Sequence, residues 1–198
     1  VWDNDGINGS KSTRSAKMIF KAPTKDELAE QTDKSSEEIK KKLEESLTDA
    51  KELQEDLEKF QKKLMEKKEL SWEDKKQLEE LLDKQKELEK NIERAKQENQ
   101  QMQNEQSEYQ EQEERIVEKQ RQVQELFEQV MTDEMKEMFK ELEKMLDKLK
   151  KEELQEMLQE MKLSNKDIEK ELDRTLETFK QMEFELKLEE TIKKLEAL

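Results

Sequence analysis

The feature that most constrains this chain is a seven-residue repeat in which apolar side chains alternate at spacings of three and four. The repeat is unbroken from Ala29 to Leu64, and a second frame runs for eight heptads from Leu78 to Val130. This spacing places the apolar side chains on one face of an α-helix, and its regularity is not expected of a disordered chain. We therefore predict a mainly α fold made of long antiparallel coiled-coil helical hairpins.

Composition excludes several classes of function. Charged residues make up 47% of the 198 residues, and the net charge is −15, so the chain as a whole repels phosphate backbones and anionic lipid surfaces. The absence of Cys and His removes thiolate and imidazole chemistry and the usual zinc ligands. With two glycines in all, a phosphate-binding loop is excluded as well. We predict a protein that is not an enzyme and that uses no cofactor, metal, small-molecule substrate or nucleic acid.

Residues 1–23 differ from the rest because they hold both glycines and the single proline. Asp3 to Gly6 is a turn signal between two short strand-like stretches, which predicts a β-hairpin. Two strands alone are marginally stable, so we expect the hairpin to be the terminal part of a larger β-sandwich. The turn lacks the ligand spacing of a helix–loop–helix calcium site, although a calcium site shared with the rest of a β-module stays open.

Four segments carry the start signals of helices. Thr24 and Ser164 open capping-box patterns, Ser71 precedes acidic residues, and Thr132 precedes Asp133. They divide the chain into a coiled-coil hairpin over 24–131 and a distal hairpin over 132–198. The predicted helices span about 25–69, 72–131, 133–162 and 165–197.

The helix predicted over 72–131 is long enough to be a shared spine on which both hairpins fold. Parallel self-association of an extended rod is the rival arrangement. Polar residues occupy one set of its core positions, either because the helix is half-exposed or because they specify pairing or a hinge. These positions are Gln85, Asn99, Gln106, Glu113 and Gln120.

Methionine and phenylalanine gather in the last third of the chain. Flexible thioethers suit grooves that bind amphipathic helices, although ordinary core packing explains the same pattern. The candidate partner-binding residues are Phe127, Met131, Met135, Met138, Phe139, Leu142 and Met145.

Three stretches resemble a family of large, uncharacterised envelope proteins of Bacteroidota: VWDNDGINGSKSTRSAKMIFKAPT, ELSWEDKKQLEELL and MKLSNKDIEKELDRTLETFKQMEFE. In that family membrane helices precede β-rich, immunoglobulin-like modules, and a long coiled coil follows. The resemblance implies a membrane-anchored protein of the cell envelope, with this part on the periplasmic side. It implies no catalytic residue, and membrane contact only through segments outside this chain.

Two functions follow from these features. The first is a structural spacer or scaffold of the cell envelope. The second is a holdase-like or adaptor clamp that binds a protein partner through the distal helices. A spacer is expected to bury its apolar stripes internally, whereas a clamp is expected to expose an apolar patch of roughly several hundred Å².

Overall fold

The computed structural model describes residues 23–67, 69–109, 113–145 and 150–196, without the side chains of Lys25, Tyr109 and Met145. These residues form α-helices and no strand, so the mainly α prediction is confirmed for them. The β-hairpin predicted within residues 1–23 lies, up to residue 22, outside the described residues. The helices are α1 (Lys25–Glu66), α2 (Trp72–Tyr109), α3 (Glu114–Val130), α4 (Asp133–Met145) and α5 (Lys151–Glu196).

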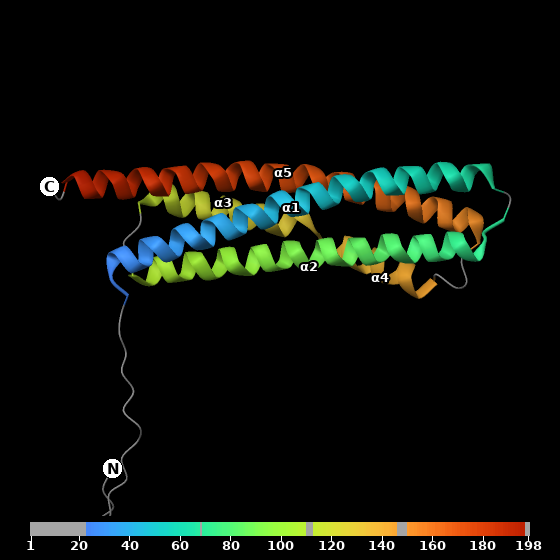
Figure 1. The fold of residues 1–198 in the computed structure, drawn as a ribbon, viewed down its shortest axis with the longest axis horizontal. Coiled ribbons are helices and arrows are strands. Elements are labelled where there is room, and N and C mark those ends of the chain that lie inside the picture. Colours follow the sequence, from blue (N-terminus) through green and yellow to red (C-terminus); the bar gives the residue numbers. More distant parts are fainter. Residues whose placement is uncertain (1–22, 68, 110–112, 146–149, 197–198) are drawn as a thin grey trace, which may run out of the picture.

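The helices form an elongated bundle in which neighbours run antiparallel (Figure 1). Helix α1 packs along both α2 and α5, and α5 also packs along α3. At about 1.5 Å per residue, the 42 residues of α1 span about 63 Å. The start of α1 and the end of α5 lie at one end of the bundle, and the α1–α2 turn lies at the other.

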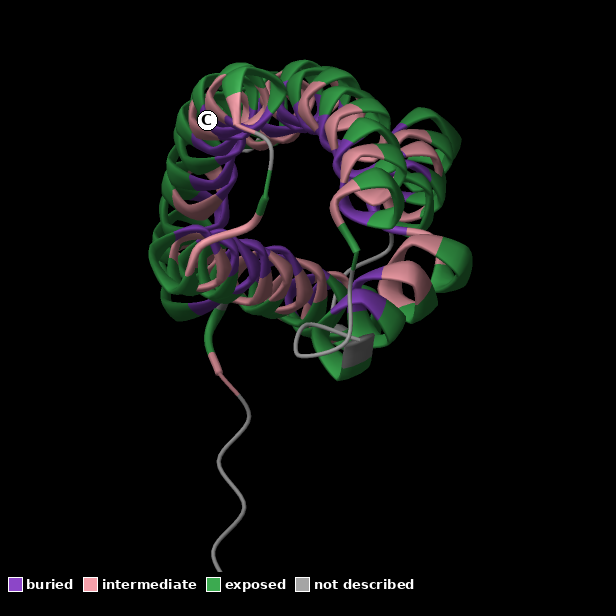
Figure 2. Ribbon diagram, turned by 90° about the vertical axis from the view of Figure 1, so that its right-hand side faces the viewer, coloured by how far each residue is buried: buried purple, intermediate pink, exposed green. Residues whose placement is uncertain are grey.

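One apolar cluster extends along the bundle and joins residues from Ile39 to Met182. Figure 2 shows the buried residues turned toward the inside of the ring of helices. Every predicted core position of α1 from Ser36 to Leu64 is buried, as are the described apolar positions of the second frame. Burial of these stripes stabilises helices whose outer surface is mostly polar and charged.

The predicted helix over 72–131 is wrong as a single element. Helix α2 ends at Tyr109, and α3 begins at Glu114 and runs back antiparallel to α2. Lys96 pairs with Glu128 at 2.7 Å, which places the two helices side by side. The heptad period continues across this reversal, so periodicity alone did not reveal it. Because the chain folds back here, α2 is not a shared spine, and α1 and α5 are the long central pair.

The helix break predicted at Ser164 is also wrong, because α5 is continuous from Lys151 to Glu196. Asn165 occupies a core position of an unbroken frame and is fully buried. Its amide nitrogen donates hydrogen bonds to the Ala50 carbonyl at 2.8 Å and to Gln54 Oε1 at 3.2 Å, both on α1. Ser164 and Asp167 match a capping box in sequence, but here they lie within one helix, and Asn165 between them links α5 to α1.

The other start signals are confirmed. The side chains and backbones of Thr24 and Glu27 form a reciprocal capping box. Thr132 Oγ1 accepts a hydrogen bond from the backbone N–H of Met135 at 3.3 Å, so α4 begins where predicted. Helix α4 is nevertheless short, because it ends at Met145 rather than near residue 162.

A buried carboxylate closes the α1–α2 turn. Asp74 is fully buried and accepts hydrogen bonds from Lys67 Nζ at 2.7 Å and from the Ser71 backbone N–H and hydroxyl at 3.0 and 2.7 Å. Lys63 adds an ion pair at 3.2 Å, and Lys151 of α5 donates to the Lys67 carbonyl. This network, which we term the turn clasp, connects α1, α2 and α5 at one end of the bundle.

The charges of the turn clasp favour the ionised form of Asp74. Burial by itself raises the pKa of the Asp74 carboxyl, but the hydrogen bonds from Lys67 and Ser71 outweigh it and hold that pKa well below its usual value. A carboxyl with a lower pKa in the folded chain contributes stability above its unfolded pKa of about 4, and this contribution is lost as pH falls below that value.

We therefore predict that Asp74→Asn lowers the free energy of unfolding at pH 7 by about 2–4 kcal/mol, because it removes the buried carboxylate that pairs with Lys63 and Lys67. The difference between Asp74→Asn and the unchanged chain should shrink as pH falls from about 5 to 2. Urea unfolding at several pH values measures both effects. Asp83→Asn, at an exposed position of α2, is the matched control. An equal loss in the two variants would show that the clasp does not stabilise the turn.

Candidate functional site

The proposed partner-binding residues are mostly part of the core. Phe127, Met131, Phe139 and Leu142 are buried, with Leu142 fully inaccessible. Met135 and Met138 are half-buried and pack against the same apolar cluster. The side chain of Met145 lies outside the described residues. The described members therefore present no continuous apolar patch to solvent.

Helix α4 is the shortest helix of the described residues, with 13 residues, and it packs against α2 and α5. The chain between Val130 and Asp133 is extended at Met131, so α4 is separated from α3 by a short break. A movement of α4 away from its neighbours would expose Met135 and Met138, but it would also uncover the buried Phe139 and Leu142, at a cost of about 1.5–3 kcal/mol for each of these two side chains.

The polar core positions do not belong to a half-exposed helix. Gln85, Asn99, Gln106 and Gln120 are all buried, and only Glu113 is exposed, because it precedes α3 at the chain reversal. The half-exposed interpretation is therefore wrong for these four residues.

Two of the polar core residues pair across the reversal. Gln120 Nε2 donates to Gln106 Oε1 at 2.9 Å, and Gln103 Nε2 donates to the Gln120 carbonyl at 3.4 Å. These bonds join the end of α2 to α3 and fix how the two helices face each other. The pairing that the sequence suggested is thus present between helices of one chain.

Other buried amides lack a hydrogen-bond partner. The side-chain oxygen and nitrogen of Gln85 and Asn99 have no partner among the described protein groups. Asn99, on α2, is fully buried. A buried amide without a partner costs on the order of 1–3 kcal/mol, so these positions weaken the bundle that they help to specify.

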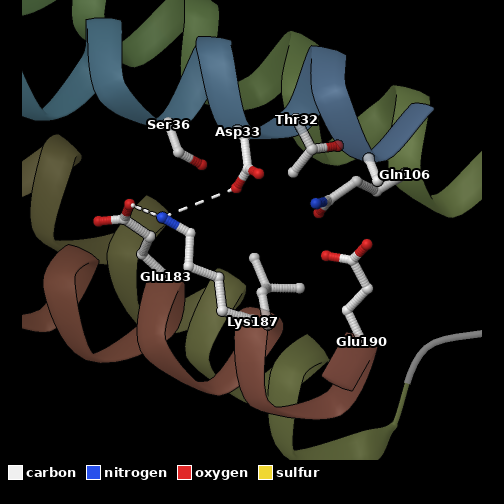
Figure 3. A pocket seen from close by; sticks show the side chains of 9 residues that line it. Thr32, Asp33, Ser36, Gln106, Glu183, Lys187 and Glu190 are labelled. Atoms are coloured by element: carbon white, nitrogen blue, oxygen red, sulfur yellow. Dashed lines mark hydrogen bonds and ion pairs between the residues drawn. The ribbon is translucent and has the colours of Figure 1, made fainter. Parts of the chain in front are cut away.

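A small polar hollow lies at the open end of the bundle, between α1, the end of α2 and α5 (Figure 3). Lys187 Nζ lies 2.8 Å from Glu183 Oε1 and 3.7 Å from Asp33 Oδ1. Lys40 reaches the second Glu183 oxygen at 3.4 Å. These ion pairs hold the start of α1 against α5.

The chemistry of this hollow is structural. The hydrogen bond from Lys187 to Glu183 raises the pKa of the Lys187 ammonium, whereas a lysine nucleophile requires a lowered pKa. The hollow encloses about 50 Å³, far less than the roughly 300 Å³ or more of a typical ligand site. Within the described part of the chain, no cluster of Asp or Glu is arranged to hold a metal ion.

An exposed apolar row on the last turns of α5 is the surface that the sequence did not reveal. The row, which we term the α5 outer stripe, lies on the face opposite the buried Phe179 and Met182. Its members are Phe184, Leu188, Ile192 and Leu195, which are 68%, 47%, 44% and 65% exposed. The spacing of Ile192 and Leu195 from Phe184 and Leu188 is the sequence signal for this second face.

Comparison of the chain with protein-family models, with curated proteins and with solved structures finds no match. In the described residues no helix combines the length and the apolar character that crossing a membrane requires. The packing and the surface of the bundle are therefore the observations that bear on function.

We predict that Asn99→Leu, which keeps the branched shape of the side chain, raises the free energy of unfolding by about 1–2 kcal/mol, because it removes a buried amide that lacks a described partner. Asn104→Leu, at an exposed position of α2, should leave stability nearly unchanged. Denaturant unfolding of the two variants measures the effect. Destabilisation by Asn99→Leu would mean that the amide makes a favourable interaction in the folded chain.

Proposed function

We propose that this chain is a structural spacer or scaffold segment of a cell-envelope protein. In this proposal its helices act as coiled-coil hairpins, and residues 1–23 are the end of a β-sandwich module on the periplasmic side of a membrane-anchored parent. The observation that carries the proposal is the continuous apolar cluster that runs from Ile39 to Met182 and buries the inward stripe of the helices. Such a bundle sets a distance, because bending it would disrupt packing along its length.

The contacts between α1 and α5 support a stiff bundle. Polar and ionic pairs connect the two helices at several levels, including Gln61 with Gln159 at 2.9 Å and Glu44 with Lys180 at 3.2 Å. Each exposed pair contributes little energy, but together they specify one axial register. The buried hydrogen bond from Asn165 to the Ala50 carbonyl specifies the same register from inside.

A clamp that binds a protein partner is the second candidate function. The extended break at Met131 before α4, together with the half-buried Met135 and Met138, favours it. Opening of α4 would present flexible thioethers to a client, which is the surface that promiscuous helix binders use. The two functions differ in whether this region opens.

The spacer function predicts one narrow distance between the two ends of the bundle. Because the chain has no cysteine, Glu38→Cys on α1 and Glu156→Cys on α5 introduce two unique labelling sites, both exposed. Glu156 lies about 27 residues along the bundle from Glu38, so a spin-label distance near 40 Å is expected. A broad or bimodal distribution would contradict a rigid spacer.

The clamp is tested on the same labelled chain by adding a client that unfolds and aggregates on heating. A spacer leaves both the client aggregation and the label distance unchanged. A clamp suppresses aggregation, and Met135→Gln with Met138→Gln should then abolish that suppression. Leu163→Gln, at an exposed position of α5, is the matched control for lost apolar surface.

A further inference from the structure

The chain reversal between α2 and α3 is the connection that the sequence specifies least. Residues 104–114 contain no glycine or proline, and most of them are glutamine or glutamate, which favour helices over turns. The apolar heptad positions stay in phase from Met102 through Tyr109 to Ile116, so a straight helix over 72–130 would keep one apolar stripe. This part of the sequence is therefore compatible with a continuous helix as well as with a reversal.

The two helix ends at the reversal are poorly stabilised. At the starts of α1, α2 and α4, backbone N–H groups donate to the side chains of Thr24, Ser71 and Thr132. Glu113, at the start of α3, accepts no such bond among the described residues, and its carboxylate pairs with Arg115 instead. The last turn of α2 contains no basic residue to offset the negative end of the helix dipole. A continuous helix would remove both of these ends.

The contacts across the reversal do not require that both helices belong to one chain. Gln120 donates a hydrogen bond to Gln106, and Lys96 pairs with Glu128. If α3, α4 and α5 of a second copy occupied the places of the same helices, these contacts would form unchanged between the copies. Only the connection between α2 and α3 would differ. Exchange of identical elements in this way is a low-cost route to a dimer.

We propose that this chain forms a domain-swapped dimer in which α2 and α3 join into one helix over residues 72–130. Each bundle of the dimer then consists of α1 and α2 from one copy and of α3, α4 and α5 from the other. The proposal does not depend on the spacer function, because a swapped and an unswapped bundle have the same internal packing.

The place of the reversal determines how the two bundles of the dimer meet. The end of α2 lies beside the start of α1 (Figure 1), and Gln31 of α1 donates a hydrogen bond to Glu105 of α2 at 2.8 Å. A continuous helix therefore leaves each bundle at the end where α1 starts. The two bundles meet at these ends, and their α1–α2 turns point away from each other.

Charge and concentration decide how much dimer forms. Residues 104–114 hold five acidic side chains and no basic one, and the dimer brings two such segments together. Salt weakens their repulsion, because at about 1 M ionic strength charges are screened within about 3 Å. Within one chain the two halves have an effective concentration of the order of millimolar, so we expect the dimer when the chain refolds at about that concentration.

Cross-linking in the full chain tests the exchange, because the unchanged chain contains no cysteine. The chain with Lys96→Cys and Glu128→Cys is refolded from urea at about 1 mM in about 1 M salt. Monomer and dimer are separated by gel filtration, and a short bifunctional thiol reagent is added to each. This pair joins α2 to α3, so it should link two chains in the dimer and link within one chain in the monomer.

A control pair keeps the test specific to the exchanged helices. Asp56→Cys with Lys84→Cys joins α1 to α2, so it should link within one chain in both the monomer and the dimer. Two results would overturn the proposal. One is the absence of a dimer under these conditions, and the other is a dimer in which the α2–α3 pair also links within one chain.

Two variants of the reversal test the continuous helix. Gln110→Asn with Glu111→Gly supplies the turn chemistry that the sequence lacks, and it should lower the dimer fraction severalfold. Glu111→Ala with Glu113→Ala raises helix propensity and removes acidic charge, so it should raise the dimer fraction severalfold. Gel filtration after refolding measures both fractions. A dimer fraction that neither variant changes would contradict a continuous helix at this place.

Discussion

The structure depends on burial of one apolar stripe from each helix against the stripes of its neighbours. A chain with 47% charged residues has little other apolar surface to remove from water, and long helices of this composition are marginal in isolation. The stripes of α1, α2, α3 and α5 therefore meet in a single cluster, and the charged residues form the outer face. Ion pairs across the helix boundaries, such as Asp56 with Lys84 at 2.5 Å, set alignment and contribute little stability by themselves.

Polar residues inside this cluster oppose stability but restrict the number of possible arrangements. An all-apolar heptad seam permits shifts by one or two turns, because each shifted register buries similar side chains. Asn165 and the Gln106–Gln120 pair form hydrogen bonds that only one register satisfies. The turn clasp around Asp74 acts similarly at the α1–α2 turn, where a buried charge needs its lysine partners in place. These interactions select one bundle from several with comparable apolar burial.

Much of the fold could be predicted from the sequence because helix class and core face follow from local periodicity. The positions from Ser36 to Leu64 and the caps at Thr24, Ser71 and Thr132 were identified correctly. Chain reversal near residue 110 was missed because the apolar period stays in phase across it. The break at Ser164 was wrong because a capping-box pattern can also occur inside a helix, where here Asn165 bonds to a helix far away in sequence. The α5 outer stripe was not predicted, because its exposure depends on where the neighbouring helices lie.

The two ends of the helical chain lie at the same end of the bundle, since α1 starts where α5 finishes. The α1–α2 turn, with the exposed Met65 and Trp72 near it, lies at the far end. Load applied through the two chain ends would therefore not pass along the length of the bundle. The dimension that such a bundle defines is how far the α1–α2 turn projects from the end at which α1 starts and α5 finishes.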